Sequence, residues 1–229
     1  MEQDEGFIET IINSLKYSVS DTGAFLWGGV AALLGSILVG VPFLFGYVTR
    51  CGREVLRGNS RLPAWDNLGE LFKDGIMVIV IMAFYGLICG LMYLLIVPFF
   101  VAGAILGSDA LLAAGMLMLA PALLISFAIG LLVPAAWVEY AVTGDVFRAL
   151  NPVNALRLAA ANPPGYIVAA VTIAIIQVIL FFPSLLTITV PWVGFIGYAS
   201  SAYIYARYYQ RTMATPAAPR TNGAATAAV

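Results

Sequence analysis

Residues 165–206 read GYIVAAVTIAIIQVILFFPSLLTITVPWVGFIGYASSAYIYA, forty-two positions without an Asp, Glu, Lys or Arg. A hydrocarbon core about 30 Å thick is crossed by roughly 20 apolar residues in a helix, because a helix satisfies its own backbone hydrogen bonds there. The stretch is long enough for two membrane-spanning helices, with a turn expected between Pro183 and Pro191. Three more uncharged runs of over twenty residues precede it. The sequence therefore predicts an all-α, polytopic transmembrane helix bundle.

The overall composition agrees with a membrane protein. Of the 229 residues, 62% are hydrophobic and 10% are charged, whereas about 25% are charged in soluble domains. The formal net charge of −1 offers no general attraction to nucleic acid, so we expect no nucleic-acid partner. The chain contains no histidine, which removes the commonest metal ligand and imidazole base catalysis. We expect no cofactor and no metal.

Polar segments divide the chain into regions. Residues 1–22 carry apolar side chains at helical spacing among acidic ones, which is typical of an amphipathic helix at the membrane interface. We expect about five spans in a transmembrane domain at residues 23–211, with cytoplasmic connectors at 49–75 and 139–164. Residues 212–229 are rich in Ala, Thr and Pro and are expected to be disordered.

The middle of the chain allows more than one division into spans. The first is expected at Ala24–Val48 and the third at Leu111–Val138. The second uncharged run, residues 76–108, is longer than one bilayer crossing and contains Pro98. Either a tilted helix or a helix followed by an interfacial piece accounts for the excess. A six-span alternative divides residues 76–138 into three.

The basic residues predict an orientation. With five spans, ten of the eleven Lys and Arg residues fall on the face of the two connectors and the C-terminal tail. The positive-inside rule assigns that face to the cytoplasm. We therefore expect a multi-pass protein of the cell membrane, with its N-terminus outside and its C-terminus in the cytoplasm. The six-span alternative divides the basic residues five against six, which counts against it.

Four arginines mark the first connector. Arg50, Arg53, Arg57 and Arg61 are separated by three, four and four residues, so a helix continuing the first span would place them in one stripe. Each basic residue near an anionic leaflet contributes about 1 kcal/mol of attraction, which makes the stripe a candidate site for lipid head groups. The alternative interpretation is that these arginines only determine topology and are partly neutralised by Glu54.

A second candidate lies directly after the arginines, in the sequence LPAWD at residues 62–66. Asp66 is a candidate N-cap for a new helix. Trp65, Leu68 and Phe72 would share one face of it, which predicts a short helix in the membrane plane. Trp65 is the candidate interfacial anchor, because tryptophan favours the depth of the head groups.

Two glycine pairs, Gly86 with Gly90 and Gly103 with Gly107, have the small-xxx-small spacing that lets two helices approach closely. We expect these pairs to pack within the chain, with homodimerisation as the second interpretation.

Residues 46–76, GYVTRCGREVLRGNSRLPAWDNLGELFKDGI, resemble the signature of a mainly archaeal membrane family, domain of unknown function 4013. The shared pattern is a Gly-Tyr pair, spaced arginines, Leu-Pro-x-Trp-Asp, and Phe-x-Asp-Gly before the next span. Residues 144–147 and 162–166 extend the resemblance over most of the chain before the tail. The resemblance implies a multi-span membrane protein and supplies no activity, cofactor or catalytic residue.

No catalytic constellation is visible in the sequence. It contains no phosphate-binding loop and no cysteine cluster, and no predicted span contains an ionisable group of the kind that ion-coupled transporters usually carry. Our first hypothesis is a noncatalytic scaffold or lipid-associated membrane protein, with residues 49–75 as its working surface. Membrane lipids are the expected partners, and a homo-oligomer or another membrane protein are further candidates. The alternative is a transporter or channel for a small neutral solute, and a membrane enzyme ranks third.

Overall fold

The computed structural model describes residues 6–213, which form helices and, within that range, no strand. In chain order the elements are α1 (Phe7–Ser18), α2 (Thr22–Gly35), α3 (Val41–Leu56), α4 (Leu68–Leu106), α5 (Asp109–Thr143), α6 (Val146–Leu150), α7 (Pro152–Ala161), α8 (Pro163–Ser184), the 3-10 turn η1 (Thr187–Thr189) and α9 (Val190–Met213). The all-α prediction is confirmed. The predicted start of the disordered tail at residue 212 falls within α9, and the remainder of that tail lies outside the described residues.

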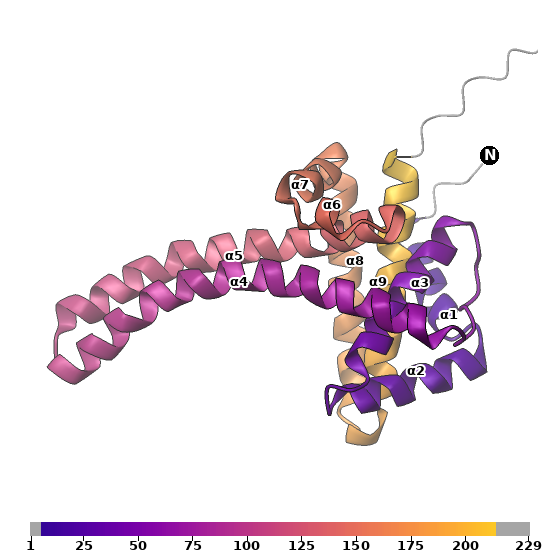
Figure 1. Ribbon diagram of the computed structural model, residues 1–229, viewed down its shortest axis with the longest axis horizontal. Coiled ribbons are helices and arrows are strands. Elements are labelled where there is room, and N and C mark those ends of the chain that lie inside the picture. The colour runs from indigo at the N-terminus through magenta and orange to yellow at the C-terminus, as the bar shows by residue number, and fades with distance from the viewer. Residues whose placement is uncertain (1–5, 214–229) are drawn as a thin grey trace, which may run out of the picture.

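Two parts of the fold are easily distinguished in Figure 1. One is a body of packed helices that contains α1, α2, α3, α8 and α9. The other is a long hairpin in which α4 and α5 lie side by side and project away from the body, across the direction of α8 and α9. The short helices α6 and α7 lie where α5 returns to the body.

The hairpin follows from two long uncharged runs with a polar turn between them. The helices contain 39 and 35 residues, or about 58 and 52 Å at 1.5 Å per residue. Gly107 adopts the left-handed conformation (φ 61°), and the Ser108 hydroxyl accepts a hydrogen bond from the Leu111 amide at 3.5 Å. Pro98 lies inside the continuous helix α4. A long helix, and not a helix plus a separate piece, therefore accounts for the second run, and the division of residues 76–138 into three spans is wrong.

Three helices in the described chain are long and apolar enough to cross a membrane, namely α4, α5 and α8. The final uncharged run contains two helices, α8 and α9, but of these α8 alone is among the three candidate spans of the described chain, so the prediction of two spans here and of about five in total is not confirmed. The connection between α8 and α9 covers residues 185–189 and includes η1, inside the interval expected for the turn. The coarse prediction of a polytopic membrane protein is supported by these helices.

The first predicted span is not one helix. Within Ala24–Val48 the chain breaks after Gly35 and restarts at Val41. Gly40 sits so close to α2 that a Cβ there would lie 2.2 Å from the Ala31 carbonyl oxygen, and Pro42 occupies the first turn of α3. With 14 residues, α2 is about 21 Å long and is too short to cross a bilayer alone. The run is apolar, as predicted, but the prediction that it forms one continuous helix is wrong.

The packing around α9 places the two ends of the described chain together. The α1 helix runs antiparallel to α9, because Ser18 lies against Ser200 (Oγ–Oγ 2.7 Å) while Phe7 shares a pocket with Arg211. The start of α1 and the end of α9 thus lie at the same end of the body. This geometry disagrees with the predicted placement of the N-terminal helix and the C-terminal segment on opposite faces.

Helices α3 and α4 cross at unusually short range. A Cβ on Gly46 of α3 would lie 1.8 Å from the Leu71 carbonyl oxygen of α4. Reciprocally, a Cβ on Gly75 of α4 would lie 1.6 Å from the Pro42 carbonyl oxygen of α3. Each helix therefore presents a glycine to the backbone of the other, and neither position has space for a side chain.

Substitution of either glycine by alanine tests this contact. We expect Gly46→Ala and Gly75→Ala each to lower the free energy of unfolding by about 3 kcal/mol or more, because the added methyl group forces the two backbones apart. The control is Gly69→Ala, which lies in the first turn of α4 with nothing within 4 Å of its Cβ position. That change should stabilise the protein by about 0.5–1 kcal/mol. Denaturant titration in one detergent measures all three, and equal effects would contradict the proposed contact.

Candidate functional site

The predicted arginine stripe is interrupted by the end of α3. Arg50 and Arg53 lie within the helix, and Arg57 is its C-cap residue. The Gly58 amide donates to the Val55 carbonyl at 2.9 Å, and Gly58 adopts a φ of 88°, a conformation that glycine tolerates best. Arg61 lies beyond this turn, outside the helix. The prediction of one helical stripe is therefore correct for Arg50 and Arg53 and wrong for Arg61.

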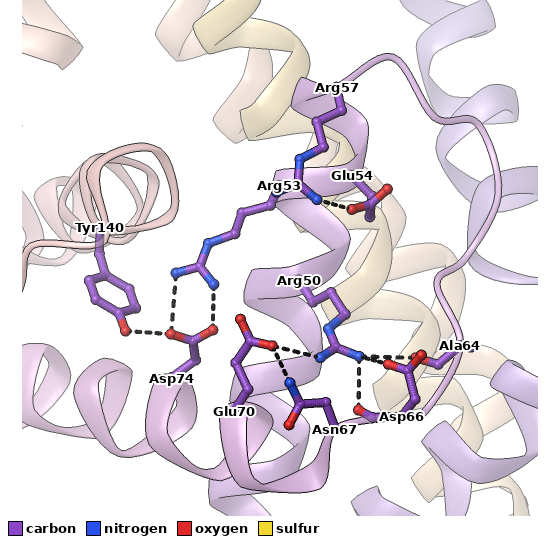
Figure 2. A network of polar contacts seen from close by, with 10 residues as sticks. All are labelled: Arg50, Arg53, Glu54, Arg57, Ala64, Asp66, Asn67, Glu70, Asp74 and Tyr140. Carbon is purple, nitrogen blue, oxygen red and sulfur yellow. Dashed lines mark hydrogen bonds and ion pairs between the residues drawn. The ribbon is translucent and has the colours of Figure 1, made fainter.

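Arg50 holds the connector between α3 and α4. One of its guanidinium nitrogens donates to the backbone carbonyls of Ala64 (3.3 Å) and Asp66 (2.9 Å) and forms an ion pair with the Asp66 carboxylate. The other lies 3.3 Å from the Glu70 carboxylate. Figure 2 shows the Arg50 side chain extended into this group of acceptors. The Arg50 side chain is 15% exposed, whereas that of Asp66 is 73% exposed.

Arg53 joins three helices. Its guanidinium group forms a bidentate pair with Asp74 of α4, one contact of which measures 3.2 Å, and its Nε donates to the Ala141 carbonyl of α5 at 3.1 Å. Tyr140 of α5 donates its hydroxyl proton to Asp74 at 2.7 Å, and its ring lies 5.6 Å from the guanidinium carbon. We call Arg53, Asp74 and Tyr140 the buried triad (Figure 2).

The buried triad keeps its charges in a poorly solvated place. The side chains of Arg53 and Asp74 are 21% and 9% exposed. Burial lowers the pKa of Arg53, but the hydrogen bond and charge of Asp74 outweigh it, so that the pKa is raised above its ordinary value. The guanidinium is therefore positive at every pH at which the protein is folded, and its partners neutralise it.

The two remaining arginines face outward. Arg57 forms an ion pair with Glu54 across one helical turn and is 69% exposed. Arg61 is exposed as well. The four arginines thus divide into an inner pair, Arg50 and Arg53, bound by several protein groups, and an outer pair, Arg57 and Arg61, at the surface.

Trp65 has partners inside the protein. Its indole nitrogen donates to the Ala24 carbonyl of α2 at 2.9 Å, and its ring stacks on Tyr47 of α3 with centroids 4.0 Å apart. The Tyr47 hydroxyl in turn donates to the Pro63 carbonyl at 2.7 Å. Trp65 therefore ties the connector to α2 and α3, and a role as interfacial anchor stays a prediction.

The short in-plane helix predicted after Trp65 does not exist as a separate element. Residues Leu68 and Phe72 belong to the first turns of α4, which continues without a break to Leu106. Asn67, with a φ of 48°, is the N-cap residue, so the prediction of Asp66 as the cap is wrong. Asp66 instead binds Arg50, an interaction between residues sixteen positions apart that helical spacing does not indicate.

Several site residues were missed by the sequence analysis. Tyr140 completes the buried triad, and the Ala141 carbonyl accepts a hydrogen bond from Arg53. Both residues belong to α5, almost ninety residues after Arg53 in the chain. Trp137 donates to the Thr49 hydroxyl at 3.0 Å, and a Cβ on Gly52 would lie 2.8 Å from the Trp137 ring. Gly52 faces this ring. A glycine at this position of α3 was the local signal that could have indicated the close approach of α5.

The other polar or small candidates are not assembled into a site. Gly86 and Gly90 have nothing within 4 Å of their Cβ positions, so the prediction that they pack within the chain is wrong. Gln177 lies against Gly197, its Nε2 3.0 Å from the Cβ position. Within residues 6–213 there is no group of three or more His, Cys, Asp or Glu side chains arranged to hold a metal.

Cys51 is enclosed beside the arginines. It lies on α3 with no solvent exposure, and its carbonyl accepts a hydrogen bond from the Tyr17 hydroxyl of α1 at 3.3 Å. Burial raises the pKa of its thiol to about 12. At neutral pH the thiolate is therefore scarce, and Cys51 serves as a small core residue and not as a nucleophile.

Comparison with known proteins identifies the family and no activity. The family described as "Protein of unknown function (DUF4013)" matches residues 29–189, and the chain belongs to it. No curated protein and no solved structure matches the chain. The match contains α3, the connector, the hairpin and α8, and hence the whole buried triad.

Removal of the Asp74 charge should strongly destabilise the protein. Asp74→Asn leaves the Arg53 guanidinium poorly solvated and without its counter-charge, which costs about 3–5 kcal/mol for buried pairs. Asp66→Asn is the matched control, since the Asp66 carboxylate is exposed and Arg50 keeps Glu70 and two backbone carbonyls as partners, so this change should cost about 1 kcal/mol or less. The free energy of unfolding in detergent distinguishes the two. Similar losses in both variants would contradict a special role for the buried triad.

Thiol labelling tests the enclosure of Cys51. In a Cys89→Ala background, we expect the folded protein to resist a membrane-permeant maleimide at pH 7–8 and to react at least about a hundredfold faster once unfolded. Gly46→Ala should raise the rate in the folded protein, because it separates α3 from α4. Rapid labelling of the folded Cys89→Ala protein, without the Gly46 substitution, would show that α1 does not cover Cys51.

Proposed function

We propose that this member of the DUF4013 family is a noncatalytic, lipid-associated scaffold of the cell membrane. The observation that carries this proposal is the exposure of the hairpin. Only 17% of the most apolar stretch of α4 and 6% of that of α5 is buried within the protein. Apolar surface of this extent is unfavourable in water and is matched by lipid chains or by the helices of another membrane protein.

The positions of the basic residues support a revised orientation. Six arginines line pockets that adjoin the last turns of α9: Arg53, Arg57, Arg148, Arg157, Arg207 and Arg211. The positive-inside rule favours the cytoplasm for this end. Because α1 starts at the same end, we propose that both ends of the described chain lie on the cytoplasmic side. The expectation that the N-terminus is outside is replaced by this arrangement.

The structure also refines the proposed lipid contact. Arg50 and Arg53 have protein partners that a lipid would have to displace, and their removal would damage the fold. Arg57 and Arg61 are exposed and can approach anionic head groups without such a loss. We therefore assign general lipid association to the outer pair and a structural role to the inner pair.

Transport of a small neutral solute remains the alternative function. The cavity between α3, α4, α5, α8 and α9 has a volume of about 240 Å³ and is lined mainly by apolar side chains, among them Phe45, Val78 and Trp137. Such a lining does not favour a hydrated path. This cavity gives the alternative no specific support.

Two measurements on the same purified protein separate these functions. Liposomes that contain the protein should be no more permeable to glycerol or urea than empty liposomes. Protein in micelles should associate with vesicles containing phosphatidylglycerol, and Arg57→Gln/Arg61→Gln should weaken this association by roughly thirtyfold, as expected for two surface charges at about 1 kcal/mol each. Lys73→Gln, another exposed change in the connector region, is the control.

The outcomes are distinct. Solute uptake that depends on the protein would support transport and overturn the scaffold. Unchanged vesicle association in the Arg57→Gln/Arg61→Gln variant, with a normal fold, would remove the outer pair as the lipid contact.

A further inference from the structure

A separate pocket lies between α1, α8 and α9, on the side of α9 away from the buried triad. Its volume is about 500 Å³, and its lining combines polar and apolar groups. Arg207, Arg211 and Asn162 are at its polar part, and Phe7, Val168 and Ile204 contribute an apolar wall. We propose that this pocket binds one phosphate-bearing amphiphile, with the phosphate at the arginines and an acyl or isoprenoid chain along the apolar wall.

The two arginines suit a phosphate group. They are four residues apart on α9, so their side chains lie on one face of the helix. Arginine presents several N–H donors in a planar fork that matches phosphate oxygens. Arg207 and Arg211 are the charged side chains of the described lining, and a phosphate would add to the interactions that both already make within the protein. Two positions on one rigid helix, rather than on a loop, fix the spacing of the donors.

The neighbouring helix end strengthens the positive potential. Asn162 caps the 22-residue helix α8, its side chain accepting from the Gly165 amide at 3.1 Å, and both residues line the pocket. The positive end of the α8 dipole therefore points to the same place as the two guanidinium groups. This contribution is secondary to that of the arginines, because the cap already satisfies the first available amide.

The polar part of the pocket is held in position by α9. The Tyr208 hydroxyl donates to the Leu158 carbonyl at 2.9 Å and lies 3.4 Å from the Asn162 carbonyl oxygen, at the junction of α7 and α8. Arg207 lies over the Tyr203 ring at 5.8 Å, and its Nη1 is 3.4 Å from the Gln210 side chain. The Tyr208 contacts fix the register of α9 against the junction of α7 and α8, and the two Arg207 contacts, both within α9, position its guanidinium group along its own helix.

The apolar wall favours an amphiphile over free phosphate. Val168 and Ile204 lie on helices that run from the arginine-bearing end toward the apolar end of the body. A chain attached to a bound phosphate would thus follow α8 and α9 in the direction of the membrane interior. Inorganic phosphate would use only the polar part, and would gain nothing from the wall.

Native mass spectrometry of the full chain in neutral detergent tests this site. With dioleoylphosphatidylglycerol added, we expect one lipid to be retained. Arg207→Gln and Arg211→Gln should each weaken its binding about ten- to a hundredfold, since a hydrogen bond to a charged group is worth about 1.5–3 kcal/mol. Lys73→Gln removes the same charge from an exposed position on α4 and should leave the retained lipid unchanged. Arg211 is exposed, so its substitution is expected to keep the fold, which circular dichroism without lipid verifies.

Additional measurements in the same experiment identify the chemical class of the ligand. Dioleoylphosphatidylcholine should bind at least tenfold more weakly, and 10 mM inorganic phosphate should not displace the retained lipid. Displacement by inorganic phosphate would show a simple phosphate site and overturn the amphiphile. Unaltered binding in a folded Arg211→Gln variant would overturn the site itself. The Arg57→Gln/Arg61→Gln variant should retain this single lipid, so failure at this pocket and failure of the proposed outer lipid contact are told apart.

Discussion

The fold depends on how closely α3 approaches α4. Gly46 and Gly75 bring the two backbones together, and at that distance Arg53 can reach Asp74 and, beyond it, Tyr140 on α5. A larger residue at either glycine would move the guanidinium away from the carboxylate. A loss of the carboxylate would leave a poorly solvated positive charge at the crossing. The steric and the electrostatic parts of this contact therefore require each other.

This crossing has a mechanical role because the hairpin has little other support. Most of α4 and α5 projects away from the body, where, among residues 6–213, each helix packs chiefly against the other arm of the hairpin. The buried triad joins α3 to both arms at the base of the hairpin, and the Trp137–Thr49 hydrogen bond adds a second link from α5 to α3. The direction of the hairpin is thus set at its base, where these polar contacts lie beside buried apolar residues such as Leu71, Ile81 and Val138 that pack into the core of the body.

The sequence predicted composition-dependent features well and long-range pairing poorly. The apolar runs indicated α4, α5, α8 and α9, because the absence of charge over twenty or more residues is a local property. The break at residues 36–40 was missed, since glycine and proline are common within membrane helices and the close approach of Gly40 to the Ala31 carbonyl of α2 appears only once the chain has turned back. The end of α3 at Arg57 was missed because the arginine spacing continued at helical periodicity while Gly58 ended the helix. Asp66 and Asp74 were visible as acids, but their pairing with Arg50 and Arg53 depends on how the connector folds back.

The same folding back changes the interpretation of the motif that carries the family resemblance. Tyr47, Arg50, Arg53, Trp65, Asp66 and Asp74 all make contacts with other parts of the protein, and Gly46 and Gly75 allow the helices to approach. The residues that seemed to form a cationic surface are mostly neutralised within the protein. These contacts show that most of the motif specifies how the hairpin leaves the helical body. In our proposals, general lipid association depends on Arg57 and Arg61 within this motif, whereas binding of one particular lipid depends on the amphipathic pocket beside Arg207 and Arg211, which combines charge with an apolar wall.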